Sequence, residues 1–219
     1  VSQLARFVPM RIVQLYFGIK GPDQDLLDWS YANQTDQFNN LPFDGQPDAD
    51  AIHQAAEESR VKLRALFAQL IPERIAQIKA GTAPDDSLTR ILSLNLPAAD
   101  AFGMDRVVIN IGGLLIGAIE TTAEAAVNVV AELFARPDAL AGARAAAEAG
   151  DDAALDGYVW EALRFSPIVA FMFRQAASPF TLARGTDREK VIGTGTTLLP
   201  LSMSAMFDPD WVEEADAFK

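Results

Sequence analysis

Cysteine is absent from this sequence of 219 residues, and histidine occurs once, at position 53. Without cysteine, no disulfide, thiolate nucleophile or thiolate metal ligand can arise within these residues. A single histidine is too few for a His-rich metal site and argues against a serine–histidine triad. We expect His53 to be a surface residue. The N-terminus VSQLARFVPM also lacks the basic-then-apolar order of a signal peptide.

Basic residues are few as well. The 18 Lys and Arg are outnumbered by 30 Asp and Glu, which gives a formal net charge of -12 and a pI of about 4.4. This balance argues against nucleic acid and against an anionic membrane surface as partners. Half of the residues are apolar, so the chain can bury a substantial core. We expect a soluble, cytoplasmic protein.

One long apolar run dominates the middle of the sequence. Residues 107–119 are apolar except for Asn110, and then Glu120, Glu124 and Asn128 interrupt the pattern. A membrane-spanning helix needs about 20 mostly apolar residues, so these polar positions argue against a transmembrane segment. We expect residues 104–136 to form the long, buried central helix of a large domain.

Helical spacing of apolar residues predicts most of the remaining structure. Further helices are expected at residues 4–19, 25–38, 51–80, 85–94, 140–149 and 151–165. Asp23 is the expected cap of the second of these segments, and Pro72 is expected to kink or split the third.

The character of the sequence changes after Pro167. Short apolar or β-branched runs separated by turn residues predict the strands of a small sheet, at residues 168–173, 180–183 and 196–201. A short helix near residues 201–205 is expected to follow. The predicted fold class is therefore mainly α with a small β-sheet.

The segment GAIETT, residues 117–122, places a glycine, an acid and two threonines inside the long helix. An interior glycine costs about 1 kcal/mol relative to alanine. Thr121 can donate to the carbonyl one turn earlier, which bends a helix, and small residues there would let a flat group approach the backbone. Glu120 and Thr121 offer a carboxyl and a hydroxyl suited to moving protons in a dry site. The residues alone also allow plain helix packing, with Glu120 in solvent or in a salt bridge.

The segment EALR, residues 161–164, is a second candidate. Glu161 and Arg164 are three residues apart and share one helix face. Such pairs usually lie on the surface, where they contribute a few tenths of a kcal/mol. The neighbouring side chains are apolar, however, and a buried pair would need further partners for the guanidinium donors.

Taken in this order, the two motifs resemble the cytochrome P-450 superfamily of haem-thiolate enzymes. GAIETT is similar to the oxygen-binding stretch of that family's central helix, and EALR is similar to its Glu-x-x-Arg motif. FSPIVAFMFRQA, residues 165–176, is similar to the strand that crosses the haem edge. The resemblance is closest over residues 107–210 and implies a partial cytochrome P-450 fold, with residues 1–219 as a single partial domain.

The resemblance divides this partial domain into four parts. They are the roof and flanking helices (1–103), the long central helix (104–136), helices that end in the Glu-x-x-Arg motif (137–167), and a small β region with a connection (168–219). The family's haem-binding loop, with its cysteine ligand, would lie beyond Lys219. We therefore expect an internal fragment that is inactive alone and whose complete protein binds haem b.

The resemblance also implies which residues form the site. Glu120 and Thr121 would be catalytic and would supply protons to dioxygen. Gly117 and Ala118 would face the haem, and Arg174 would pair with a haem propionate. The remaining assignments are a substrate pocket lined by Ile116, Val169, Ala170 and Phe171, and a structural pair, Glu161 and Arg164.

The implied function is that of a haem-dependent monooxygenase acting on an apolar small molecule or lipid, such as a fatty acid, with an electron-donor protein as partner. The details MFRQAAS, LARGTDR and SAMFD are similar to a branch associated with fatty-acid peroxidase-like domains. A peroxygenase or a lipid hydroperoxide isomerase is therefore an alternative, although the intact Glu120–Thr121 pair favours monooxygenation. A helical interaction module without haem is a second alternative, favoured by the missing cysteine and disfavoured by the retained motifs.

Overall fold

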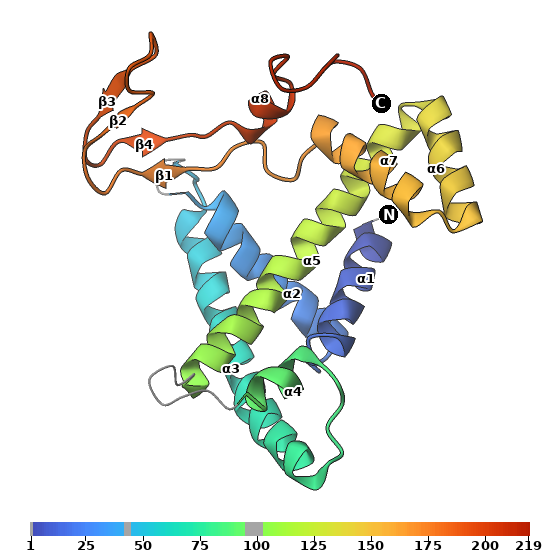
Figure 1. The fold of residues 1–219 in the computed structure, drawn as a ribbon. Coiled ribbons are helices and arrows are strands. Elements are labelled where there is room, and N and C mark those ends of the chain that lie inside the picture. Colours follow the sequence, from blue (N-terminus) through green and yellow to red (C-terminus); the bar gives the residue numbers. More distant parts are fainter. Residues whose placement is uncertain (1, 42–44, 95–102) are drawn as a thin grey trace. The chain divides into compact units, whose positions relative to one another are not determined.

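The computed structural model describes residues 2–41, 45–94 and 103–219 (Figure 1). The chain divides into two compact units, Val1–Val127 and Asn128–Lys219, which we call unit 1 and unit 2. Each unit has a hydrophobic core of its own, and each is described by itself.

The described part of unit 1 is helical. Its elements are α1 (Ser2–Leu15), α2 (Asp23–Gln34), the π-helical turn η1 (Thr35–Asn39), α3 (Ala49–Ala80), α4 (Ser87–Leu92) and the larger part of α5 (Met104–Phe134). All the helices that the apolar spacing predicts for this region are present, with ends that differ by a few residues. The second predicted helix is divided, because its last turn widens into η1.

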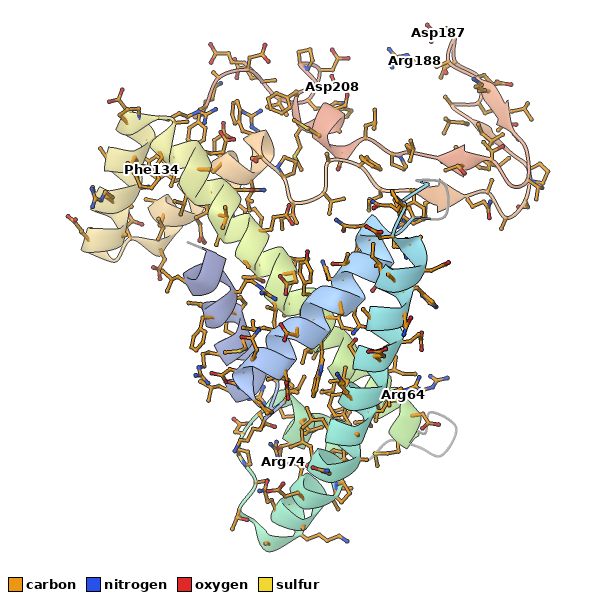
Figure 2. All side chains as sticks on the ribbon, turned by 180° about the vertical axis from the view of Figure 1, so that it is seen from behind. Arg64, Arg74, Phe134, Asp187, Arg188 and Asp208 are labelled. Carbon is orange, nitrogen blue, oxygen red and sulfur yellow. The ribbon has the colours of Figure 1, made fainter. Side chains whose placement is uncertain are left out.

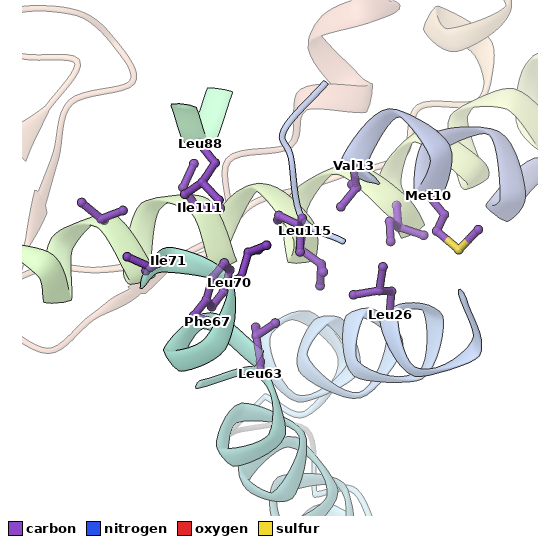
Figure 3. Packing of buried hydrophobic residues seen from close by; sticks show 13 residues of the cluster. Met10, Val13, Leu26, Leu63, Phe67, Leu70, Ile71, Leu88, Ile111 and Leu115 are labelled. Atoms are coloured by element: carbon purple, nitrogen blue, oxygen red, sulfur yellow. The ribbon is translucent and has the colours of Figure 1, made fainter. Parts of the chain in front are cut away.

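The core of unit 1 lies where these helices meet (Figure 3). Val107, Ile111, Leu115 and Ile119 recur every four residues and form the buried stripe of α5. The other helices contribute Met10, Val13, Leu26, Leu63, Phe67, Leu70, Ile71 and Leu88 to the same cluster. This packing fixes how α5 is rotated about its axis, and so decides which of its side chains face away from the core.

A buried ion pair joins α3 to α4. Arg74 donates to the Asp86 carboxylate, and both side chains are only 2 % exposed (Figure 2 labels Arg74). The same carboxylate caps α4 by accepting from the backbone N–H of Thr89 at 2.8 Å. Gly18 packs against this group with a φ of +80°, and a Cβ there would lie 2.5 Å from Asp86. The chain can therefore reverse between α1 and α2 only with glycine at this position.

The cap predicted at Asp23 and the split predicted at Pro72 are both wrong, whereas a kink at Pro72 stays a prediction. Asp23 does not cap α2: the capping position is Pro22, and Asp23 begins the helix and accepts from Arg11 and Gln14, each at 2.9 Å. Pro72 does not split α3, which runs unbroken from Ala49 to Ala80. Proline removes one backbone hydrogen bond, but Ile71 and Arg74 on either side are buried and hold the helix in place.

Unit 2 contains the end of α5, three further helices and two small sheets. In chain order the elements are α6 (Pro137–Ala149), α7 (Asp152–Phe165), β1 (Arg174–Gln175), β2 (Phe180–Leu182), β3 (Lys190–Ile192), β4 (Thr197–Leu198) and α8 (Ser202–Met206). Its core is built on Val129, Leu133, Ala143 and Ala162. The predicted fold class, mainly α with a small amount of β structure, is confirmed.

The strand predictions are correct only in part. The described residues form two separate antiparallel pairs, β1 with β4 and β2 with β3, instead of one small sheet. Residues 168–173 do not form a strand, although the Met172 N–H donates to the Pro200 carbonyl at 3.0 Å. The sequence analysis missed β3, because three residues between polar neighbours give too short a pattern to recognise.

The helix α5 is buried on one face only. Ile109, Val130 and Phe134 are among its exposed apolar side chains, so the expected burial of this helix is found on one face only in the described residues. By length and composition, α5 is the one described helix that could cross a membrane. The core helix of a water-soluble protein passes the same test, so this finding carries little weight.

Candidate functional site

The predicted site residues are divided between the two units. The GAIETT residues lie on the part of α5 that belongs to unit 1. The EALR pair lies on α7, and Arg174 begins β1, both in unit 2.

The glycines of α5 have different surroundings. A Cβ on Gly112 would lie 3.4 Å from the ring of Phe67, so this glycine lets α5 pack closely against α3. A Cβ on Gly113 or Gly117 would meet nothing within 4 Å. Gly113 and Gly117 are four residues apart, so they line one face of the helix and leave its backbone open. Only these two are available to a flat group approaching α5.

Thr121 continues this open face by one more turn. Its hydroxyl donates to the carbonyl of Gly117, four residues earlier, as the sequence analysis predicts. The threonine side chain therefore bonds to the backbone at the glycine that leaves the helix face open. Gly117 and Thr121 therefore lie one turn apart on the same face of α5.

Glu120 faces a different direction from Thr121, because successive helix residues are about 100° apart. Its carboxylate accepts from a terminal guanidinium nitrogen of Arg6 at 2.7 Å, and the side chains are 28 % (Arg6) and 15 % (Glu120) exposed. The same nitrogen of Arg6 donates to the Leu27 carbonyl of α2 at 2.9 Å. The structure shows the salt bridge that the packing interpretation of GAIETT allows, and the proton-transfer role of Glu120 stays a prediction.

The other predicted residues of α5 lie at the edge of the core. Ile116 and Ala118 are partly buried and pack against the hydrophobic cluster of unit 1. Their predicted roles, in the substrate pocket and against the haem, stay predictions.

In unit 2, Glu161 and Arg164 form a well-connected ion pair. Arg164 donates to both carboxylate oxygens, at 2.9 and 2.7 Å, and the two side chains are about 15 % exposed. Hydrogen bonds from Arg164 hold the pKa of Glu161 below its usual value, although burial acts in the opposite direction. The remaining donors of Arg164 bind the carbonyls of Met206, Ala215 and Ala217, at 3.1, 2.6 and 2.8 Å. The extra partners that a buried pair requires are thus backbone carbonyls.

The residues that follow α7 are exposed. Val169, Ala170 and Phe171 lie on the surface of unit 2, and so does Arg174. The Arg174 guanidinium donates to the Phe173 carbonyl at 2.7 Å and has no carboxylate within 4 Å among the residues that the structure describes. A permanently charged donor in this setting can bind an anionic group. Its assignment to a propionate stays a prediction.

The single histidine lies outside these groups. His53 is 61 % exposed, as predicted, and its ring nitrogen lies 3.1 Å from the Asp36 carboxylate. Burial raises the pKa of Asp36, but hydrogen bonds from Arg60, Asn40 and His53 outweigh it and hold this pKa below its usual value.

No family model matches the sequence, and no curated protein matches it. Solved structures do match. Cytochrome P450 CYP109Q5 from Chondromyces apiculatus is similar with a TM-score of 0.74 and 21 % identity, over 99 % of this chain and 47 % of that chain. CYP109E1 from Bacillus megaterium in complex with testosterone has a TM-score of 0.73 and 20 % identity, over 99 % of this chain and 52 % of that chain. P450BioI in complex with an acyl carrier protein ligated to hexadec-9Z-enoic acid has a TM-score of 0.72 and 21 % identity, over 98 % of this chain and 50 % of that chain.

The chain has the cytochrome P450 fold. It spans about half the length of each P450 structure that it matches. The family resemblance inferred from the sequence is thereby confirmed at the level of the fold. Identities of 20 and 21 % do not extend this conclusion to the reaction or the substrate.

The P450 fold implies a haem, and the described residues fit one face of it. The face of α5 at Gly113 and Gly117 is open to a flat macrocycle, because neither position carries a side chain that would block it. The described residues contain no group of three or more His, Cys, Asp or Glu side chains that could hold a metal ion. Because the sequence has no cysteine, an axial thiolate would have to come from outside these 219 residues.

Sequence reasoning missed one residue that contacts the site. Arg6 bonds to Glu120 across 114 positions of sequence, and nothing local to either residue indicates the contact. Only the packing of α1 beside α5 brings the two side chains together. A charged residue at an inward-facing position of the first helix is the one signal that could have suggested it.

Proposed function

We propose that the complete protein containing this chain is a haem-dependent monooxygenase that inserts an oxygen atom from dioxygen into an apolar substrate. The observation that carries the proposal is the open face of α5, where Gly113 and Gly117 leave the backbone uncovered and the Thr121 hydroxyl lies one turn further on. The P450 fold supports the same reading.

The haem would supply the oxidising chemistry, which the protein positions and tunes. Gly117 would leave room for the macrocycle and for dioxygen against the helix backbone. Thr121 would offer its hydroxyl as hydrogen-bond donor and acceptor on that face. Glu120 would accept protons and pass them on at the adjacent position, within a part of the structure that partly excludes water.

Unit 2 would contribute binding and support. Arg174 would bind a carboxylate of the cofactor through a charge-assisted hydrogen bond. Glu161 and Arg164 would fix the chain around residues 206–217 through the ion pair and the three carbonyl contacts. From this unit, Val169, Ala170 and Phe171 would line the substrate pocket.

The proposed substrate is apolar, because the residues assigned to the pocket are aliphatic or aromatic. The similar structures include one with testosterone and one with a fatty acyl chain on a carrier protein, so a steroid-like or fatty acyl molecule is the class to test first. A monooxygenase would also need an electron-donor protein. An isomerase that rearranges hydroperoxides would not need the Glu120–Thr121 pair, and no contact of the described residues favours that alternative.

The test is the carbon-monoxide difference spectrum of the reduced complete protein. A Soret band of the thiolate type supports the proposal, because it requires haem iron bound by a cysteine. A folded complete protein that shows no such band after reconstitution with haem would contradict it. Turnover of an apolar substrate with an electron donor, but not with hydroperoxide alone, would then separate monooxygenation from peroxide chemistry.

A further inference from the structure

The contact between Arg6 and Glu120 joins three helices at one point. Arg6 lies on α1, donates to the Glu120 carboxylate of α5 at 2.7 Å and to the Leu27 carbonyl of α2 at 2.9 Å. Its guanidinium carbon also lies 5.7 Å from the centre of the Tyr31 ring on α2. The guanidinium of α1 is therefore held by two groups of α2 while it binds the carboxylate of α5.

This ion pair differs from the exposed pairs of the chain. Pairs between fully exposed side chains contribute little, because water screens them and holding two long side chains costs entropy. Arg6 and Glu120 are 28 and 15 % exposed, and the backbone bond to Leu27 already restricts the guanidinium. Arg11, on the same helix, provides a contrast, because it pairs with Asp23 in an exposed position.

We propose that Arg6 is a positioning residue that holds the Glu120 carboxylate in place, one helix position from the Thr121 hydroxyl. The inference rests on the proposed function for its catalytic consequence. A carboxylate that moves freely would spend little time in the geometry that proton transfer requires, and small displacements reduce rates strongly. Arg6 acts through Glu120 and contributes no proton of its own, since arginine stays protonated.

The first test is a double-mutant cycle on the complete protein, with Arg6→Gln, Glu120→Gln and the two combined. If Arg6 holds Glu120, Arg6→Gln should shift the unfolding equilibrium by about threefold more when Glu120 is present than when glutamine replaces it. Additive effects would overturn the inference. This cycle needs no bound cofactor, so it remains decisive even if the haem spectrum contradicts the proposed function.

The second test measures the catalytic consequence in the haem-loaded protein. Arg6→Gln should lower the product formed per electron pair about tenfold and leave the substrate KM unchanged. It should also raise the solvent deuterium isotope effect on kcat. Arg6→Lys, which keeps the charge and a donor, should restore most of the yield, and the control Arg11→Gln should match the wild type.

A purely structural role for Arg6 gives a different pattern. Arg6→Gln would then lower stability and leave the product yield and the isotope effect unchanged, which would overturn the positioning role. If Arg6→Gln fails to fold, Arg6→Lys decides the question. A yield between those of the wild type and Glu120→Gln, with a raised isotope effect, supports the positioning role. Wild-type values of both quantities overturn it.

Discussion

Arg164 donates to both carboxylate oxygens of Glu161 from the next turn of α7, at 2.9 and 2.7 Å. The Glu161 carboxylate also accepts from the backbone N–H of Lys219 at 2.9 Å. Together with the carbonyls of Met206, Ala215 and Ala217, this pair connects α7 to the last part of the described chain. The relationship predicts a pH-dependent contribution to stability.

Glu161→Gln should lower the stability of the 219-residue chain at neutral pH, by about 1–3 kcal/mol for the loss of charged hydrogen bonds. Because the folded-state pKa of Glu161 lies below its ordinary value, the unfolded chain takes up the proton first. The contribution is therefore complete above the ordinary value of 4.5 and is lost as the pH falls through the folded-state pKa. Urea unfolding at several pH values measures the difference.

Glu124→Gln is the control for this experiment, because it removes the same charge from an exposed position on α5. The stability gap between the two variants should close as the pH falls from neutral towards acid. A gap that stays constant with pH would show that the ionised carboxylate is not what Arg164 holds.

Arg74→Met should destabilise unit 1 severely, by about 3–5 kcal/mol, because it leaves the Asp86 carboxylate buried without its cation. Thermal and urea unfolding of the 219-residue chain measure the loss. The matched variant is Arg90→Met, which breaks an exposed pair with Asp85 and should change stability little. Equal stabilities of the two variants would mean that the pair does not stay buried in solution.

Gly112 and Gly117 should respond in opposite ways to replacement by leucine. Gly117→Leu adds a side chain in open space and removes an interior glycine, so the 219-residue chain should gain about 0.5–1 kcal/mol. Gly112→Leu would press against Phe67 and should cost about 1–3 kcal/mol through overpacking.

In the complete protein, Gly117→Leu should abolish the thiolate-type carbon-monoxide band, because the added side chain fills the space that the proposal reserves for the haem. Haem content and the difference spectrum are the measurements. A complete protein that keeps its normal band with leucine at this position would place the haem elsewhere.

Thr121→Ala should uncouple electron use from product formation in the complete protein, with hydrogen peroxide released instead. The variant removes the only hydroxyl that bonds back to Gly117 among the described residues, and leaves Glu120 paired with Arg6. Product and peroxide per electron pair are the quantities to measure. Thr122→Ala is the control on the neighbouring, exposed position, and normal coupling in Thr121→Ala would remove this residue from the proposed site.

Much of the local structure could be read from short segments. The helix predicted from residue 85 begins at Ser87 with Asp86 as its cap, and α3 ends at the predicted residue, followed by Gly81 with its left-handed φ of 69°. These signals are local, because a cap or a terminator acts within one helical turn. The wrong prediction at Asp23 arises because local signals do not include contacts with other helices. Aspartate is a residue type that often caps a helix, but the Asp23 carboxylate is held by Arg11 and Gln14 of α1.

The helices, the mainly α class and the two motifs that indicate the P450 fold could be predicted from the sequence, because spacing, capping and motif order are properties of the chain in one dimension. Which glycines of α5 stay uncovered depends on packing between helices: Gly112 packs against Phe67, whereas Gly117 faces open space. The tertiary structure also decided that Glu120 pairs with Arg6, 114 residues away. Both outcomes depend on how α5 is rotated against α1 and α3, and that rotation follows from packing the buried stripe of α5 into a core that the whole of unit 1 builds.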